Sequence, residues 1–292
     1  MKYSVSSYSY ASMIRAGEIT PFEVIAKTKE LGFDAIEFVD FIDFLPIPEE
    51  ERPAYAEKIK AEADRVGLEI SCLTIGADFI NGSDGDVEKE IERVKKFVDL
   101  GAILGVKRMR HDATVGYAWN SGNYVAFETL LPRLADACRT VTEYAEQFGI
   151  RTMIENHGFY AQDSDRVEKL HQAINHKNFG LLCDMGNFLC ADENPALSFS
   201  RVAPYVAYVH AKDFIVKPFN EDPGMGAFQT RSGNWLRGTI VGHGNVPVKQ
   251  CLHMIKKTGY DAYISIEFEG LEPVPVALKI GLDNLKRYWS QL

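Results

Sequence analysis

The stretch Thr152-Met153-Ile154-Glu155-Asn156 is a short apolar run that ends in a carboxylate and continues into polar residues. Three further stretches share this pattern, an apolar run closed by an ionisable side chain: Leu181-Leu182-Cys183-Asp184-Met185, Ala207-Tyr208-Val209-His210-Ala211 and Ile264-Ser265-Ile266-Glu267-Phe268. Such runs are typical of buried strands, where an unpaired charge costs several kcal/mol. Four such groups on neighbouring strands could relieve that cost together by sharing a divalent metal ion.

Short β-type runs of this kind alternate with amphipathic helical stretches eight times along the chain. Strands are expected at residues 4–8, 35–39, 69–75, 106–110, 151–155, 179–183, 206–210 and 263–268. Helices are expected at residues 20–31, 52–66, 86–100, 125–148, 164–174, 195–202, 246–257 and 275–289. Strict alternation predicts parallel strands joined by helical crossovers. Eight units favour an α/β fold of the (β/α)8 TIM barrel type over an open sheet.

Composition is compatible with that fold. The chain has 292 residues, of which 46% are hydrophobic and 25% charged, and no linker or shift in composition divides it. We therefore expect a single domain spanning residues 1–292. A formal net charge of −9 argues against general affinity for nucleic acid, which depends on neutralising phosphates.

The sequence also bears on location. Residues 1–6 lack the apolar core of a secretory signal, and no apolar stretch is long enough to cross a membrane. The five cysteines are scattered, without a Cys-x-x-Cys pair, which is typical of reduced thiols in a cytosol. We therefore expect a cytoplasmic protein without a membrane partner.

In a TIM barrel the active site lies where the strands end. Seven side chains fall at or near predicted strand ends: Glu37, Thr74, His111, Glu155, Asp184, His210 and Glu267. The connection at residues 213–245 is too long for a simple loop and carries aromatic residues, arginines and glycines. It suits a lid over a polyol, and an oligomer contact or a mobile hairpin is the alternative. Whether the chain forms a homo-oligomer therefore stays open.

Three carboxylates and one imidazole make a hard ligand set. Glu155, Asp184, His210 and Glu267 are expected to hold one divalent ion per chain, Mn²⁺ in the first place, with Mg²⁺, Co²⁺ or Zn²⁺ as alternatives. Two open positions on the ion could take the carbonyl oxygen and a neighbouring hydroxyl of a sugar, and the ion would stabilise an enediolate.

Glu155 and Glu267 approach from different strands and are the expected catalytic acid–base pair. Removing and returning a proton on opposite faces of one carbon gives epimerisation. Transfer to the neighbouring carbon gives aldose–ketose isomerisation.

Five more residues are candidates for substrate binding: Glu37, His111, His157, Asn187 and Lys212. Several of them have a structural alternative. Glu37 could instead pair with a neighbouring cation, and His111 could be a hydrogen-bonded strand end. Lys212 could neutralise an oxyanion or pair with Asp213 beside it.

Six motifs carry a resemblance to a known family: Gly32-Phe33-Asp34-Ala35-Ile36-Glu37, Ile154-Glu155-Asn156-His157, Leu182-Cys183-Asp184-Met185-Gly186-Asn187, Val209-His210-Ala211-Lys212-Asp213, Gly242-His243-Gly244-Asn245-Val246-Pro247 and Ile266-Glu267. With these motifs the chain resembles the xylose-isomerase-like superfamily of sugar phosphate isomerases and epimerases. That superfamily also contains D-tagatose 3-epimerase, inosose dehydratase and endonuclease IV. The resemblance implies a metal held by Glu155, Asp184, His210 and Glu267, with the two glutamates as the acid–base pair.

Two departures from the family pattern concern the substrate. Asn187 stands where the epimerases and endonuclease IV usually carry histidine, and Phe159-Tyr160-Ala161 stands where the epimerases carry a second glutamate. The resemblance thus implies a substrate other than a plain free ketohexose. Seven histidines are too few for the three-zinc cluster of the nuclease.

The leading hypothesis is therefore a divalent-metal-dependent sugar isomerase or epimerase with a small carbohydrate substrate. The first alternative is a metal-dependent dehydratase or lyase acting on a keto-sugar or keto-inositol, in which His111 or His157 protonates the leaving group. The second is a non-catalytic carbohydrate-binding barrel. No glycine-rich phosphate motif is evident near the last two strands, which favours an unphosphorylated substrate.

Overall fold

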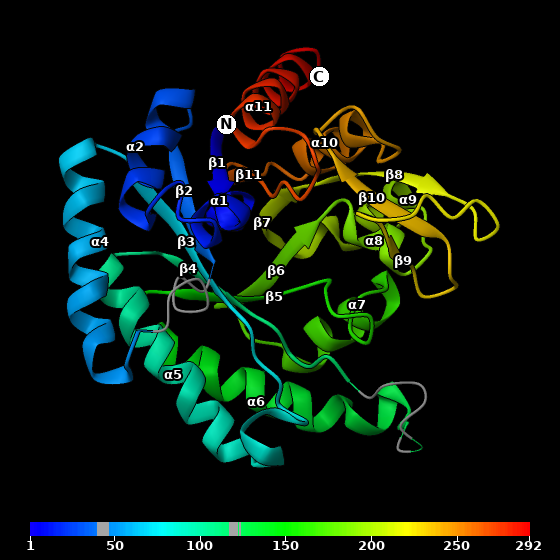
Figure 1. Ribbon diagram of the computed structural model, residues 1–292. Coiled ribbons are helices and arrows are strands. Elements are labelled where there is room, and N and C mark those ends of the chain that lie inside the picture. Colours follow the sequence, from blue (N-terminus) through cyan, green and yellow to red (C-terminus); the bar gives the residue numbers. More distant parts are fainter. Residues whose placement is uncertain (40–46, 117–121, 123) are drawn as a thin grey trace.

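Eight parallel strands form a closed barrel at the centre of the molecule, surrounded by helices (Figure 1). The computed structural model describes residues 1–39, 47–116, 122 and 124–292. The barrel strands are β1 (Lys2–Ser6), β2 (Ala35–Val39), β3 (Glu69–Ile75), β4 (Arg108–His111), β5 (Arg151–Glu155), β6 (Phe179–Asp184), β7 (Val206–Ala211) and β11 (Tyr263–Ile266). Because β1 pairs with both β2 and β11, the sheet closes on itself. The predicted single-domain TIM barrel is confirmed.

A helical segment follows each barrel strand, as the alternation predicted. The helices are α1 (Ala11–Arg15), α2 (Pro21–Leu31), α4 (Arg52–Val66), α5 (Val87–Leu104), α6 (Phe127–Glu146), α7 (Ser164–Ile174), α8 (Asn187–Cys190), α9 (Pro195–Val202), α10 (Val248–Lys257) and α11 (Val274–Ser290). Among these described helices, none has the length and apolar character needed to traverse a bilayer. The two chain ends lie on the same side of the barrel in Figure 1.

Helix α2 illustrates how local sequence sets the element boundaries. The side chain of Thr20 accepts a hydrogen bond from the N–H of Glu23, and the carboxylate of Glu23 accepts one from the N–H of Thr20. This reciprocal capping box satisfies two backbone donors at the start of the helix. Gly32 ends the helix at φ 92°, a left-handed conformation that glycine adopts without steric cost.

The barrel lumen is filled by side chains. A buried cluster inside the sheet comprises Ala35, Cys72, Met153, Leu182, Ala207, Tyr208, Ala262 and Tyr263. Since alternate residues of a strand face the same side, the residue two positions after each inward side chain also points inward, one layer higher. This rule places Glu155 above Met153, Asp184 above Leu182 and His210 above Tyr208.

The stretch expected as one long connection, residues 213–245, contains a separate three-stranded antiparallel sheet. Its strands are β8 (Asp213–Lys217), β9 (Phe228–Gln229) and β10 (Trp235–Thr239), in the order β8-β10-β9. Buried side chains of Phe214 and Leu236 pack with Cys190 and hold this sheet against the barrel. The sheet projects beside α8 and α9 in Figure 1. From the sequence we predicted a long connection here but none of these three strands, because each is short and glycine-containing turns separate them.

Candidate metal centre

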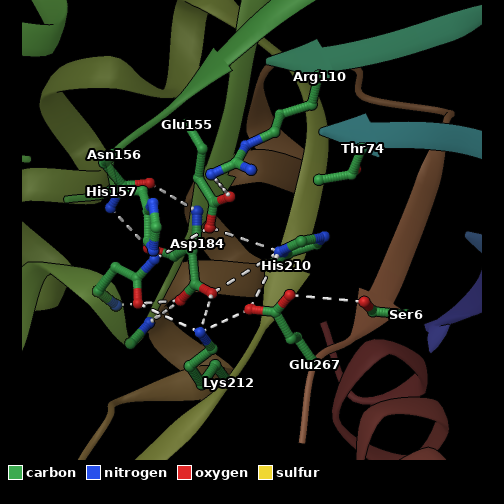
Figure 2. A network of polar contacts seen from close by, with 12 residues as sticks. Ser6, Thr74, Arg110, Glu155, Asn156, His157, Asp184, His210, Lys212 and Glu267 are labelled. Atoms are coloured by element: carbon green, nitrogen blue, oxygen red, sulfur yellow. Dashed lines mark hydrogen bonds and ion pairs between the residues drawn. The ribbon is translucent and has the colours of Figure 1, made fainter. Parts of the chain in front are cut away.

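Four side chains from four neighbouring strands converge at the C-terminal end of the barrel. They are Glu155 and Asp184, the last residues of β5 and β6, His210 in β7, and Glu267 directly after β11. One ligand atom of each lies within 4.8 Å of those of the others, and all four residues are buried. His210 Nδ1 lies 3.6 Å from Glu155 Oε1, 3.8 Å from Asp184 Oδ2 and 3.7 Å from Glu267 Oε2. Figure 2 shows the four side chains pointing toward a common centre.

Two atoms of this cluster are the kind that a cation would satisfy. Asp184 Oδ2 and His210 Nδ1 are buried and have no hydrogen-bond partner in the part of the chain that the structure describes. The other oxygen of Asp184 accepts hydrogen bonds from the backbone N–H groups of Gly186, at 2.7 Å, and Asn187, at 3.0 Å. These bonds aim Oδ2 at the centre of the cluster. Since buried polar atoms are nearly always paired, the residues present fit a divalent cation.

The ring of His210 is oriented by a carboxylate behind it. His210 Nε2 lies 2.8 Å from Glu37 Oε2, and the hydroxyl of Thr74 donates a hydrogen bond of 2.7 Å to Glu37 Oε1. A proton on Nε2, donated to Glu37, leaves the lone pair of Nδ1 facing the cluster, as a metal ligand requires. Glu37 is fully buried, and its partners are this imidazole and the hydroxyl of Thr74. The structural alternative for Glu37 was a neighbouring cation, and the structure has the ring of His210 in that place.

Lys212 lies within the same cluster. Its Nζ is 2.5 Å from Glu267 Oε2 and 3.5 Å from both Asp184 Oδ2 and Glu269 Oε1. Asp213 makes a different set of contacts and accepts hydrogen bonds from backbone N–H groups. The structure therefore places the Lys212 ammonium group where negative charge on a substrate oxygen could be stabilised.

Asn187 also contacts the cluster. Its amide Nδ2 donates a 2.9 Å hydrogen bond to Glu155 Oε1, and Lys212 Nζ lies 3.4 Å from its Oδ1. The amide thus bridges a carboxylate and a cation at the edge of the cluster. A side chain in this place can hold a ligand carboxylate and still face a bound substrate.

The three carboxylates of the cluster differ in acidity. Burial would raise the pKa of Glu155, but Arg110 and His210 together outweigh burial and hold the pKa well below its usual range. Glu267 also has a lowered pKa, because Lys212 and His210 together more than offset the effect of its burial. Burial raises the pKa of Asp184 to about 6. Without a cation, the cluster therefore crowds carboxylates that repel one another.

Arg110 begins a chain of ion pairs from Glu155 to the barrel mouth. Its Nη2 lies 2.8 Å from Glu155 Oε2 and 2.5 Å from Asp112 Oδ1. Asp112 Oδ1 in turn lies 3.1 Å from Nδ1 of His157, whose side chain is about half exposed. Sequence reasoning assigned no role to Arg110 or Asp112. The signal that could have found Arg110 is the alternation of β4, which turns it into the lumen.

His111 lies on the opposite face of β4 from Arg110. Its ring packs edge-on against Phe79, with centroids 5.6 Å apart, and its Nδ1 is 2.9 Å from the backbone oxygen of Asp112. Burial lowers the pKa of His111 to about 4. These contacts match the alternative of a hydrogen-bonded strand end.

A pocket of about 700 Å³ opens at the barrel mouth beside this chain of contacts. Loops after β4 and β5, helix α7 and the β9–β10 turn contribute its described lining: Val115, Gly116, Tyr124, His157, Gly158, Phe159, Tyr160, Arg166, Thr230 and Arg231. His157 connects this pocket to the cluster through its contact with Asp112, which pairs with Arg110 beside Glu155.

Comparison with known proteins gives a family match over most of the chain. Residues 25–288 match the model of the xylose isomerase-like TIM barrel family. Inosose dehydratase from Lacticaseibacillus casei is 24% identical over 139 residues, which is 47% of this chain and 46% of that protein. The match thus spans about half the length of this curated relative.

Solved structures share the fold along nearly the full chain. A probable 3-DHS dehydratase, AsbF, from Bacillus anthracis superposes with a TM-score of 0.71 at 19% identity, covering 98% of this chain and 99% of that one. The IolI protein with a bound zinc atom gives a TM-score of 0.75 at 17% identity, covering 100% and 99%. D-psicose 3-epimerase with D-fructose gives a TM-score of 0.73 at 14% identity, covering 99% of each chain.

Proposed function

The chain belongs to the xylose isomerase-like TIM barrel family, and we propose that it is a divalent-metal-dependent isomerase or epimerase of a small sugar-like carbonyl compound. The observation that carries this proposal is the convergence of Glu155, Asp184, His210 and Glu267. Within the described residues, one ligand atom each of Asp184 and His210 is buried and has no hydrogen-bond partner. A structure with the same fold, that of the IolI protein, has a bound zinc atom, which agrees with this proposal.

When bound, a divalent cation would polarise the substrate carbonyl and stabilise the charge that develops on its oxygen. Glu155 and Glu267 stand at the ends of β5 and β11, which are separated in the barrel by β6 and β7. They therefore reach a substrate from different sides. One carboxylate removes the proton beside the carbonyl, and the other returns a proton to the opposite face or to the neighbouring carbon.

Neighbouring side chains fix the positions of the two glutamate carboxylates and place positive charge beside them. Arg110 and Asn187 fix both oxygens of Glu155, and Arg110 keeps that carboxylate ionised and able to accept a proton. Lys212, held against Glu267, offers a cation close to the developing charge. Manganese as the natural metal stays a prediction, with magnesium, cobalt and zinc as alternatives.

A dehydratase is the second candidate, and one observation favours it. Asp112 holds Nδ1 of His157 at 3.1 Å while the half-exposed ring faces the pocket, which is the arrangement of a group that can protonate a departing hydroxyl. The names of two similar proteins, inosose dehydratase and 3-DHS dehydratase, agree with this candidate.

Incubation in D₂O separates these functions. The purified chain, loaded in turn with Mn²⁺, Mg²⁺, Co²⁺ or Zn²⁺, would be mixed with D-fructose, D-tagatose or 2-keto-myo-inositol and followed by NMR and mass spectrometry. An isomerase or epimerase incorporates deuterium without losing mass to dehydration, whereas a dehydratase yields a product lighter by one water.

Glu155→Gln and Glu267→Gln should each abolish exchange. If sugars bind to the loaded protein but exchange no hydrogen, and Glu155→Gln leaves binding intact, the barrel is a carbohydrate-binding protein and the catalytic proposal fails.

A further inference from the structure

Two arginines line the pocket at the barrel mouth and share a single carboxylate. Arg231 Nη1 lies 3.0 Å and Arg166 Nε 3.5 Å from Asp163 Oδ2. We propose that this pair binds an anionic group of the substrate, a carboxylate or a phosphate, while the carbonyl end of the same molecule reaches the metal centre. The inference rests on the proposed function for the identity of the occupant, and it narrows the substrate class to anionic sugar-like compounds.

Charge supports an anionic occupant. One carboxylate faces two guanidinium groups, which leaves one positive charge in excess among the three side chains. Each arginine side chain is about one-fifth to one-quarter exposed, at 24% for Arg166 and 22% for Arg231, and both line the pocket. A guanidinium has more N–H donors than the recorded contacts use, and its planar fork matches carboxylate and phosphate oxygens.

Both arginines are held in place before any ligand arrives. Arg166 donates a 2.8 Å hydrogen bond to the backbone oxygen of Tyr160 and stacks over the rings of Phe127 and Tyr160. Arg231 donates to the backbone oxygen of Phe159. Binding an anion here would therefore require little ordering of side chains, which favours affinity.

Hydrogen bonds to Cys190 and Asp192 hold the β9–β10 turn that carries Arg231. The backbone N–H of Arg231 donates to the oxygen of Cys190 at 2.8 Å. On either side of it, the hydroxyl of Thr230 and the backbone N–H of Ser232 donate to the carboxylate of Asp192, both at 2.7 Å. These bonds hold the turn, and with it Arg231, in a defined position at the pocket.

The rest of the pocket suits a carbon skeleton. Phe159 is 44% exposed. Its backbone has the left-handed conformation, with φ 64°. Non-glycine residues with positive φ are uncommon and occur preferentially at binding sites. Phe159 and Tyr124 both line the pocket and offer it aromatic surface.

Calorimetric titration of the full chain with three probes tests the inference: 5-keto-D-gluconate for the carboxylate, D-fructose 6-phosphate for the phosphate, and D-fructose as the neutral reference. At least one anionic probe should bind tenfold or more tightly than D-fructose, and added salt should weaken its binding. Preference for one of the two probes identifies the anionic group. Equal affinity for all three overturns the inference.

Variants locate the binding group. Arg231→Gln and Arg166→Gln should each weaken the anionic probe at least tenfold and leave D-fructose unchanged, whereas Arg231→Lys should retain part of the affinity. Asp163→Asn should strengthen anion binding, because it removes the competing carboxylate while asparagine can still cap α7 through its side-chain oxygen. If the two arginines only support the local fold, Asp163→Asn should instead weaken binding of the anionic probe, as the arginine variants do.

Two controls complete the design. Arg65→Gln changes an exposed arginine that pairs with Glu62, and should have no effect on any probe. Thermal unfolding of each variant shows whether the fold is intact. Titrations repeated after EDTA treatment separate the two proposals. If the anionic probe still binds without metal but the metal-loaded protein exchanges no deuterium, the arginine site is supported and the proposed catalysis fails.

Discussion

Glu37 sets the direction in which His210 presents its ring. The carboxylate contacts Nε2 with both oxygens, at 2.9 Å and 2.8 Å, and a negative partner makes an imidazole a better metal ligand. Replacing Glu37 with glutamine keeps the shape but removes the charge. We expect Glu37→Gln to weaken metal binding about tenfold or more, measured by competition with a chromophoric chelator.

The matched control for this prediction is Glu18→Gln, at an exposed glutamate. It should bind metal as the parent chain does. An unchanged dissociation constant in Glu37→Gln would show that the ring needs no carboxylate behind it.

His111 should influence stability through pH. Burial lowers its pKa to about 4 in the folded protein, whereas the ordinary pKa of a histidine in an unfolded chain is about 6.5. The unfolded chain therefore binds a proton that the folded chain does not bind between these values. The contribution of His111 to the free energy of unfolding is fully present above pH 6.5 and is lost as the pH falls toward 4. The loss amounts to roughly 2 kcal/mol between pH 7 and pH 5.

His111→Asn removes this dependence while keeping an N–H that can reach the backbone oxygen of Asp112. Chemical denaturation measures the free energy of unfolding of the parent chain and of the variant at pH 7 and at pH 5. The change between the two pH values is then compared, because the effect of a cavity left by the substitution is the same at both. If the variant loses as much stability on acidification as the parent chain, His111 is not the group responsible.

Single residues differed in how far sequence could place them. Glu155, Asp184, His210 and Glu267 were recognisable because each closes an apolar run, and the structure brings these four together. Asp112 carried no such signal, since it follows a polar strand end and its partners are Arg110 on β4 and His157, which comes after β5. A contact made by side chains distant in sequence depends on barrel geometry, which a local pattern does not contain.

At the scale of elements, Asp213 organises the turn between β10 and α10. Its carboxylate accepts hydrogen bonds from the backbone N–H groups of Gly242, Gly244 and Val246, at 2.8, 2.9 and 3.0 Å. A β-carbon added at Gly244 would overlap this carboxylate and would lie 2.5 Å from the backbone oxygen of Phe214. We expect Gly244→Ala to destabilise the protein by about 2 kcal/mol or more, measured by urea unfolding.

Gly76→Ala is the control, because a β-carbon there has open space around it. This variant should be neutral or stabilised by about 0.5 kcal/mol through the reduced freedom of the unfolded chain. Equal stability of the two variants would mean that the turn can move away from Asp213.

Elements with clear capping residues and terminating glycines could be predicted from the sequence. Elements without such residues could not. The cap at Thr20 and the stop at Gly32 gave α2 nearly residue by residue. Strand β4 was expected at residues 106–110 and lies at Arg108–His111, because its charged side chains hide the apolar pattern. The β8–β10 sheet escaped prediction because its hydrophobic contacts, such as Phe214 with Leu236, join residues across a long glycine-rich excursion.

At the scale of the whole molecule, the alternation of strand and helix was enough to predict the barrel. Eight parallel strands with crossover helices leave two exposed edges, and pairing β1 with β11 removes both. The direction of each strand then places every strand end at one mouth. The fold could therefore be predicted from periodicity, whereas the pocket depends on loops and on the β9–β10 turn, whose positions no periodicity determines.

The metal centre ties together four strands that are contiguous in the barrel, β5, β6, β7 and the end of β11, so its occupancy should change the stability of the whole fold. A cation at a hundred times its dissociation constant stabilises the folded state by about 2.7 kcal/mol, which corresponds to roughly 4–5 °C in Tm for a chain of this size. Adding EDTA should reverse the shift in differential scanning calorimetry.

Asp184→Asn makes this prediction specific to the site. Asparagine can still accept the backbone hydrogen bonds of Gly186 and Asn187, but it removes a carboxylate whose pKa burial raises to about 6. We therefore expect the metal-free variant to unfold at a temperature equal to or above that of the metal-free parent, and to gain little on adding metal. Asp261→Asn, at an exposed aspartate, should keep the full shift. A shift that persists in Asp184→Asn would place the stabilising cation elsewhere in the molecule, because the cluster would then lack one of its four ligands.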